Sequence, residues 1–221
     1  MQTSNIEQNL ESVKKHVAVA CQRANRSLDD VTIIAVSKTQ PYPMIATAFD
    51  AGVMHFGENR VQEAQEKIEK LSHINTIWHL IGHLQTNKVK TAVQLFDIIH
   101  SVDSVRLAEV ISRQADNEIE VLLQVNVAQE ETKGGFTVAE LPKALKTIGE
   151  LPNIKVQGLM TIAPWISDPE EVRPVFKRLR ELRDSLRLKH LSMGMTDDYE
   201  VAIEEGATMV RIGRAIFGAR S

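Results

Sequence analysis

Short apolar segments alternate with helical patterns along almost the whole chain, and this alternation limits the possible folds more than any other feature. Eight segments of apolar and β-branched residues predict strands, at 31–39, 53–56, 76–80, 96–100, 119–127, 155–160, 190–192 and 208–212. Helical patterns separate them, at 45–51, 61–71, 84–95, 105–115, 137–149, 168–188 and 197–205. The mean spacing of about 25 residues matches the strand-plus-helix unit of a (β/α)8 barrel. We therefore predict a single α/β domain with a parallel barrel over residues 29–221.

The segment before the first strand predicts an additional helix. Its apolar side chains recur every three or four residues and form one stripe: Ile6, Leu10, Val13, Val17 and Cys21. We expect residues 1–28 to pack against the outside or the lower end of the barrel. An open doubly wound sheet is the alternative fold. It needs a glycine-rich turn after the first strand, and here that turn is S-K-T-Q-P.

Composition argues against several classes of function. The 221 residues include 26 Lys and Arg against 29 Asp and Glu, and no basic block suggests a nucleic-acid ligand. No apolar run approaches membrane-spanning length, and the first residues lack the basic and apolar regions of a secretion signal. The single cysteine fits a reducing compartment. We expect a cytoplasmic protein that binds neither nucleic acid nor membrane.

A lysine follows the first predicted strand. Segment 31–39 ends in Ser37, Lys38 and Thr39, and in a barrel the residues after each strand face the mouth where sites are built. Burial there disfavours an ammonium ion and favours the neutral amine that attacks an aldehyde to form a Schiff base. On the residues alone, the alternative is an ordinary surface lysine just past a strand.

The loops after the last two predicted strands indicate a phosphate site. One predicted strand ends at Ser192 and is followed by Gly194 and Thr196, and Gly213 and Arg214 follow the next. Glycines let the backbone approach a ligand, hydroxyls and N–H groups donate to it, and the arginine adds charge. The alternative is ordinary turn geometry with a capping hydroxyl or carboxylate. A lysine across the mouth from a phosphate site suits an aldehyde that carries a phosphate, and pyridoxal 5′-phosphate is the obvious candidate.

Five motifs together resemble the YggS/PROSC family of pyridoxal 5′-phosphate homeostasis proteins: V-S-K-T, F-G-E-N-R-V-Q-E, W-H-L-I-G-H-L-Q-T-N-K, S-M-G-M-T-D-D and R-I-G-R-A-I-F-G. The resemblance spans nearly the whole chain. It implies a barrel similar to the N-terminal domain of alanine racemase, with the cofactor held as an internal aldimine on Lys38.

The resemblance also assigns the other cofactor-binding residues. Asn59 would approach the ring, and Arg211 would face the pyridine nitrogen. The remaining assigned positions, most of them around the phosphate, are Ser192, Gly194, Met195, Thr196, Gly213 and Arg214. Serine is frequent in the family at position 196, where this chain has a threonine, and a small hydroxyl residue is frequent at 214. With arginine at 214 the hydroxyl contact there is replaced by contacts from backbone N–H groups. A cation beside the ring nitrogen disfavours its protonation and weakens carbanion chemistry.

Two classes of function follow from the resemblance: a carrier that binds, buffers and delivers the cofactor to apo enzymes, and a racemase or decarboxylase. A two-base racemase takes its second base, a tyrosine, from a C-terminal domain of the partner subunit. This sequence ends at Ser221, directly after the last predicted barrel element, and its tyrosines are Tyr42 and Tyr199. We therefore expect a monomeric, non-catalytic carrier. A Schiff-base aldolase of sugar phosphates would use the same lysine and loops and is the third alternative.

One histidine pair has the spacing of a metal site. His79 and His83 stand four residues apart, but they flank a predicted strand end and no glutamate follows the first histidine. We expect them to pack or to line the mouth, and we expect no metal site.

Overall fold

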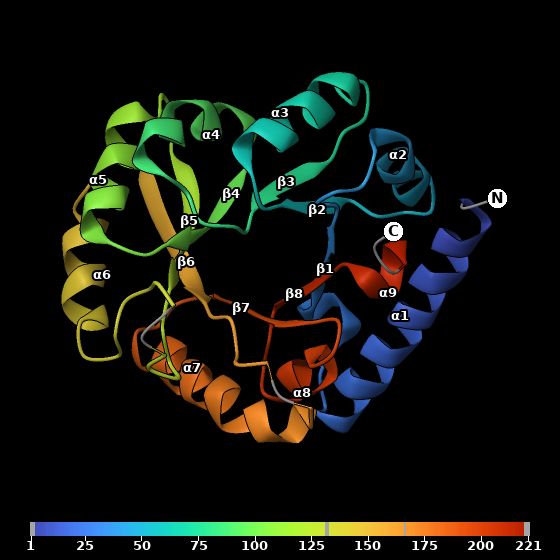
Figure 1. Ribbon diagram of the computed structural model, residues 1–221. Helices are drawn as coiled ribbons and strands as arrows, with labels where there is room; N and C mark the ends of the chain where they lie inside the picture. Colours follow the sequence, from blue (N-terminus) through green and yellow to red (C-terminus); the bar gives the residue numbers. More distant parts are fainter. Residues whose placement is uncertain (1–2, 131–132, 166, 219–221) are drawn as a thin grey trace.

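Eight parallel strands close into a barrel in the computed structural model, which describes residues 3–130, 133–165 and 167–218 (Figure 1). Each strand pairs with the next, and the last pairs with the first. The strands are β1 Thr32–Val36, β2 His55–Glu58, β3 Ile77–Leu80, β4 Ile98–Val102, β5 Ile119–Gln124, β6 Ile154–Met160, β7 His190–Met195 and β8 Met209–Ile212. The predicted barrel with an additional N-terminal helix is confirmed.

Helices surround the barrel (Figure 1). They are α1 Thr3–Arg23, α2 Tyr42–Asp50, α3 Val61–Lys70, α4 Val89–Leu95, α5 Val105–Gln114, α6 Leu141–Gly149, α7 Arg173–Ser185, α8 Tyr199–Glu204 and α9 Arg214–Phe217, with 3-10 turns η1 Leu28–Asp30, η2 Thr86–Lys88 and η3 Pro169–Val172. The helices predicted at 84–95 and 168–188 each begin as one of these 3-10 turns. The four-residue helix α9 was not predicted, because so short a segment shows no helical period.

The apolar residues divide into two layers. Strand residues alternate in direction, so that one set faces the helices and the other faces the interior of the barrel. The larger core cluster includes Val121 and Leu123 of β5 together with the helix residues that cover the barrel. A smaller separate cluster consists of Ile34, Leu122, Met160 and Met209, from β1, β5, β6 and β8. These four residues fill only part of the interior, and polar side chains occupy much of the rest.

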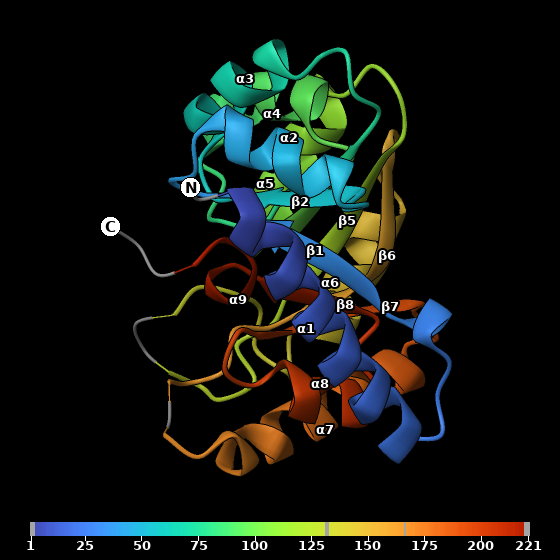
Figure 2. The same cartoon turned by 90° about the vertical axis from the view of Figure 1, so that its right-hand side faces the viewer.

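Helix α1 packs along the outside of the barrel beside α8 and α9 (Figure 2). All five residues of its predicted apolar stripe are buried, so this interpretation of the sequence is confirmed. The Asn9 side-chain amide also donates to the carbonyl of Ile216 at 3.0 Å.

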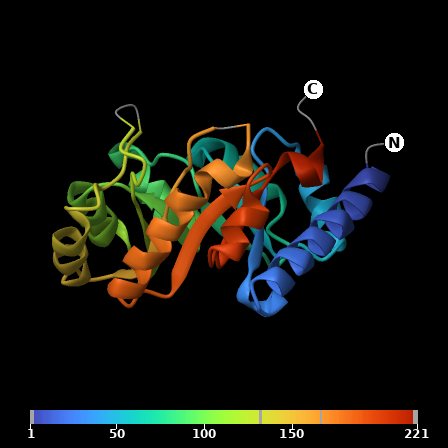
Figure 3. The ribbon, with the colours of Figure 1, turned by 90° about the horizontal axis from the view of Figure 1, so that it is seen from below.

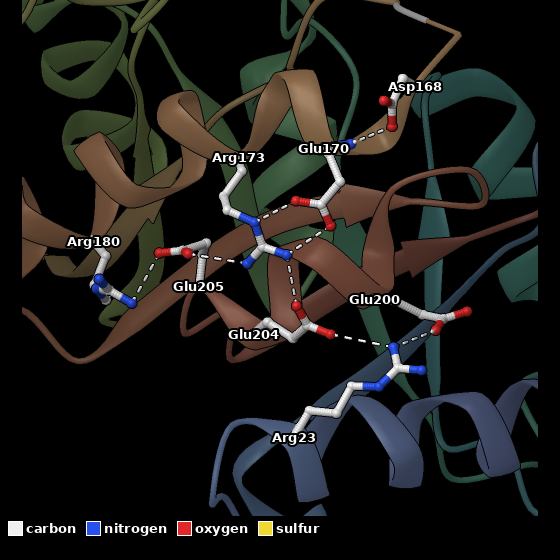
Figure 4. Close-up of polar contacts among 8 residues, drawn as sticks. All are labelled: Arg23, Asp168, Glu170, Arg173, Arg180, Glu200, Glu204 and Glu205. Carbon is white, nitrogen blue, oxygen red and sulfur yellow. Dashed lines mark hydrogen bonds and ion pairs between the residues drawn. The ribbon is translucent and has the colours of Figure 1, made fainter.

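An ion-pair network links α7, α8 and α1 on the outer surface (Figure 4). The Arg173 guanidinium contacts Glu170 at 2.6 Å, Glu204 at 2.7 Å and Glu205 at 3.1 Å. These carboxylates, Glu170 above all, raise the pKa of Arg173. Glu204 also contacts Arg23 of α1 at 3.4 Å. Networks of this kind contribute more than isolated surface pairs, and this one ties the N-terminal helix to the last third of the barrel.

The loops that follow β5 and β6 rise from one end of the barrel, the upper end in Figure 3. This is the carboxyl end of the strands, where Lys38 also lies. None of the helices in the described part of the chain combines the length and the hydropathy that crossing a lipid bilayer requires.

Gly158 provides a test of the strand register. It pairs with His190 across β6 and β7, and a Cβ at this position would lie 2.1 Å from the His190 carbonyl oxygen. We expect Gly158→Ala to lower the free energy of unfolding by about 3 kcal/mol or more, because two backbones would have to separate. The control is Gly149→Ala at the end of α6, where a Cβ meets nothing within 4 Å. It should raise the free energy by up to about 1 kcal/mol. Equal urea midpoints for the two variants would contradict the register.

Candidate functional site

Lys38 lies in a turn directly after β1, at the carboxyl end of the barrel. Its side chain is half-buried, whereas the preceding Ser37 is completely buried. Thr39 has a φ of +65°, a left-handed conformation that costs a residue with a side chain about 1–2 kcal/mol. The strand order places Asn59, after β2, on one side of Lys38 and Gly213, after β8, on the other. A Cβ on Gly213 would lie 3.4 Å from the Val36 carbonyl oxygen, which shows how close these two strand ends are.

The loops after β7 and β8 adjoin each other, as the sequence predicts. Met195 pairs with Arg211 across the two strands, and Met195 is 38 % exposed at the mouth. Gly194, which was predicted to follow the strand but lies in the last part of β7, has a φ of +88°, and a Cβ there would lie 2.5 Å from the Ala202 Cβ, so glycine lets α8 pack against this end of the strand. The Arg214 guanidinium forms an ion pair with Asp197, which joins the start of α9 to the loop after β7.

Ser192 and Arg211 lie below the mouth, inside the barrel. Arg211 donates to the Ser192 hydroxyl at 2.6 Å and to the Thr161 carbonyl at 2.8 Å. Burial lowers the pKa of Arg211 to about 10, so the guanidinium stays charged at neutral pH. The Ser192 hydroxyl is completely buried and also contacts His100 at 2.8 Å. The phosphate contact predicted for Ser192 stays a prediction; its hydroxyl contacts interior groups, and Gly194 and Thr196 are the predicted residues nearer the mouth.

A buried ammonium ion holds the turn that carries Lys38. Lys67 of α3 donates to the Ser37 carbonyl, to Glu58 and to Glu63, each at 2.7 Å. These three bonds use all three donors of the ammonium group. Glu58 also accepts from the Ser37 hydroxyl at 2.6 Å, and Glu63 accepts from the backbone N–H of Thr39. We call Lys67, Glu58 and Glu63 the clamp, because they fix the backbone on both sides of Lys38.

The clamp has an unusual carboxylate. Glu58 is completely buried, and burial raises its pKa despite hydrogen bonds from Lys67 and Ser37 that lower it. Its Oε2 atom has no hydrogen-bond partner among the described residues. Sequence reasoning missed the clamp. The available signal is that Lys67 continues the buried stripe of α3 after Val61 and Ala64, three residues apart.

The two histidines with metal-like spacing do not converge. His79 is completely buried inside the barrel, where its ring contacts His55 at 3.0 Å and His100 at 2.9 Å. His83 is exposed in a loop and contacts Asp103 at 3.2 Å. Over residues 3–130, 133–165 and 167–218, no group of three histidine, cysteine or carboxylate side chains is arranged to hold a metal ion. The row of interior histidines is the second feature that sequence reasoning missed.

A cavity of about 800 Å³ opens over the loops after β2 and β3 and the start of α3, and its lining residues do not include Lys38 or the residues that follow β7 and β8. Asn59, Gly82, His83 and Lys88 are among its lining residues. The Oδ1 atom of Asn59 is buried and lacks a hydrogen-bond partner in the described part of the chain. A volume of this size suits a small organic ligand. The site therefore combines a strand-end lysine, an amide oxygen without a partner and two glycine-bearing loops around one mouth.

Comparison with known proteins agrees with this fold. Residues 3–221 match the family model of the alanine racemase N-terminal domain. The pyridoxal phosphate homeostasis protein of Aquifex aeolicus is 47% identical over 222 residues, which cover 96% of this chain and 97% of that protein. A crystal structure of an unknown protein from Bifidobacterium adolescentis superposes with a TM-score of 0.93 at 38% identity. The match covers 97% of this chain and 95% of that chain. The structure of PipY from Synechococcus elongatus, solved with PLP bound, superposes with a TM-score of 0.84 at 38% identity. The match covers 96% of this chain and 100% of that chain.

The clamp predicts a large loss of stability when its cation is removed. Lys67→Met should lower the free energy of unfolding by about 3–5 kcal/mol, because it leaves two carboxylates, one of them fully buried, without their partner. Urea denaturation at pH 7 measures the loss. Lys67→Met combined with Glu58→Gln should recover part of it, and Lys90→Met, at an exposed lysine of α4, is the matched control. A Lys67→Met variant as stable as Lys90→Met would refute the clamp.

Proposed function

This chain belongs to the alanine racemase N-terminal domain family and, within it, to the pyridoxal phosphate homeostasis proteins, and we propose that it binds pyridoxal 5′-phosphate through Lys38 as a carrier. The observation that carries this proposal is the position of Lys38, half-buried at the carboxyl end of β1 and held by the clamp. The proposed carrier delivers the cofactor to apo enzymes, acts as a cytoplasmic monomer and has no significant catalytic activity.

The residues around the mouth fit this cofactor. When bound, pyridoxal 5′-phosphate supplies an aldehyde that reacts with amines and a pyridine ring that withdraws electrons. The Lys38 amine is the group that would react with the aldehyde. The Asn59 amide, whose buried Oδ1 has no partner among the described residues, is the group that would approach the ring from the end of β2. Gly194, with its left-handed φ, and Gly213 leave space for backbone contacts with a phosphate.

Arg211 supports a carrier better than an enzyme. A guanidinium is charged at every physiological pH and can only donate hydrogen bonds. If it faces the pyridine nitrogen, as we propose, it leaves that nitrogen unprotonated, and an unprotonated ring withdraws electrons less strongly. The site would then bind the cofactor while discouraging reactions at the α-carbon of an amino acid. A carboxylate at the same position would have the opposite effect.

The covalent assignment to Lys38 can be tested directly. We expect the purified protein, after incubation with pyridoxal 5′-phosphate and borohydride reduction, to carry the mass of one reduced cofactor on the peptide that contains Lys38. Lys38→Ala should lose this adduct and keep its urea midpoint. Lys88→Ala, in the neighbouring cavity, is the control and should keep the adduct. An adduct that remains in Lys38→Ala and maps to another lysine would overturn the assignment.

The carrier and racemase alternatives differ in two measurable activities. We expect the loaded protein to restore the activity of an apo pyridoxal-phosphate enzyme, and Lys38→Ala, incubated and washed in the same way, to restore much less. In deuterated water, the loaded protein should not exchange the α-proton of L- or D-alanine at an appreciable rate, because Arg211 disfavours a protonated ring. Rapid α-deuterium incorporation would instead establish the enzyme alternative.

A further inference from the structure

Polar side chains form a continuous row through the interior of the barrel. The His55 ring contacts His79 at 3.0 Å, His79 contacts His100 at 2.9 Å, and His100 contacts the Ser192 hydroxyl at 2.8 Å. Arg211 donates to that hydroxyl at 2.6 Å. We call His55, His79 and His100 the histidine chain. They come from β2, β3 and β4, while Ser192 and Arg211 come from β7 and β8 on the other side of the barrel.

Arg211 sets the direction of every hydrogen bond in this row. A guanidinium only donates, so the Ser192 hydroxyl accepts from Arg211, and its own proton then needs an acceptor. That acceptor is His100 Nδ1, the other group that contacts this completely buried hydroxyl. A proton on His100 Nδ1 would leave the Ser192 O–H without an acceptor, and a doubly protonated ring would place a second cation close to Arg211. His100 is therefore neutral, with its proton on Nε2.

The same reasoning extends along the chain. His100 Nε2–H donates to His79 Nδ1, so His79 also carries its proton on Nε2 and donates it to His55 Nδ1. Burial supports neutral rings, because it lowers the pKa of His79 to about 3 and that of His100 well below its usual value. Each ring then turns a lone pair towards Arg211 and a proton away from it.

This polarity compensates a buried charge. Arg211 is 4 % exposed, and the two acceptors that it contacts, the Ser192 hydroxyl and the Thr161 carbonyl, are both neutral, while the Asp198 carboxylate favours its charge without a hydrogen bond to it. A buried cation needs acceptors whose negative ends point at it. The hydroxyl oxygen is a better acceptor for Arg211 when its own proton is donated to a further acceptor. His100 is that acceptor, and His79 accepts in turn from His100. The row ends at half-buried His55, the first residue of β2, at the end of the barrel opposite Lys38.

We propose that His100 and His79 are positioning residues for Arg211: the histidine chain, polarised in one direction, orients the guanidinium and thereby controls the protonation of the group that Arg211 faces. The second part rests on the proposed function, in which that group is the pyridine nitrogen of the cofactor. The first part concerns only residues of this chain and can be tested without the cofactor.

The first measurement reads the tautomers. In the unloaded protein, uniformly ¹⁵N-labelled at histidine, long-range ¹H–¹⁵N correlation at pH 7.5 distinguishes a proton on Nδ1 from one on Nε2. We expect His100 and His79 to be neutral with the proton on Nε2, with assignments from single substitutions and with exposed His73 as a reference of mixed tautomers. A proton on Nδ1, or a cationic ring, at His100 or His79 overturns the proposal whether or not the protein binds a cofactor.

The second measurement reads the effect on the cofactor. In His100→Asn the side-chain oxygen can replace Nδ1 as the acceptor for Ser192, whereas His100→Leu removes the acceptor. With cofactor ¹⁵N-labelled in the ring, we expect the bound ring nitrogen to keep its chemical shift in His100→Asn and in the control His73→Leu. We expect it to move towards the protonated value in His100→Leu. Identical shifts in all four proteins overturn the positioning role. Failure to bind the cofactor refutes the proposed function instead, while the tautomer measurement still decides the histidine chain.

Discussion

The interior of this barrel is organised around one buried positive charge. Parallel barrels normally fill their interior with layers of branched apolar side chains, yet here Arg211 occupies an inward position of β8. Removing a guanidinium from water costs several kcal/mol unless its donors find acceptors. The Thr161 carbonyl and the Ser192 hydroxyl supply them, and the hydroxyl needs His100 in turn. Polar residues on strands β2, β3, β4 and β7 therefore follow from a single residue on β8.

The clamp holds the backbone of the turn that carries Lys38 at the mouth of the barrel. Lys38 sits in a turn whose next residue, Thr39, has a left-handed backbone, and such a conformation persists only where the surrounding structure enforces it. Lys67 and Glu63 enforce it from outside the barrel, through the Ser37 carbonyl and the Thr39 N–H. The turn that carries the proposed aldehyde-binding lysine is therefore held by α3, while Arg211 is positioned from inside the barrel. The two groups that would act on one ligand are held by independent networks.

The fold could be predicted from the sequence because its signal is repeated eight times, so that an error in one segment changes little. The individual strand ends were less predictable. β2 was predicted to stop at Phe56, but it continues to Glu58. The sequence around Glu58 does not show this, because its buried carboxylate is stabilised by Lys67, nine residues further on. β4 was likewise predicted to stop at His100, but it continues to Val102, and the partners of His100 come from β3 and β7. In both cases the missing information was a partner distant in sequence.

The same limitation explains what could be predicted of the site. Lys38 and Gly213 could be located from the sequence, since their positions after strands place them at the mouth whatever their neighbours are, and Gly194 lies at the carboxyl end of β7, which continues past its predicted end at Ser192. The role proposed for Arg211 depends instead on its neighbours, which come from other strands. An aldehyde-binding lysine is common to a carrier and an enzyme, so Lys38 cannot distinguish them. In the proposed carrier the opposite side of the ligand meets a fixed cation, and the barrel interior, from His55 to Ser192, is arranged around a cation.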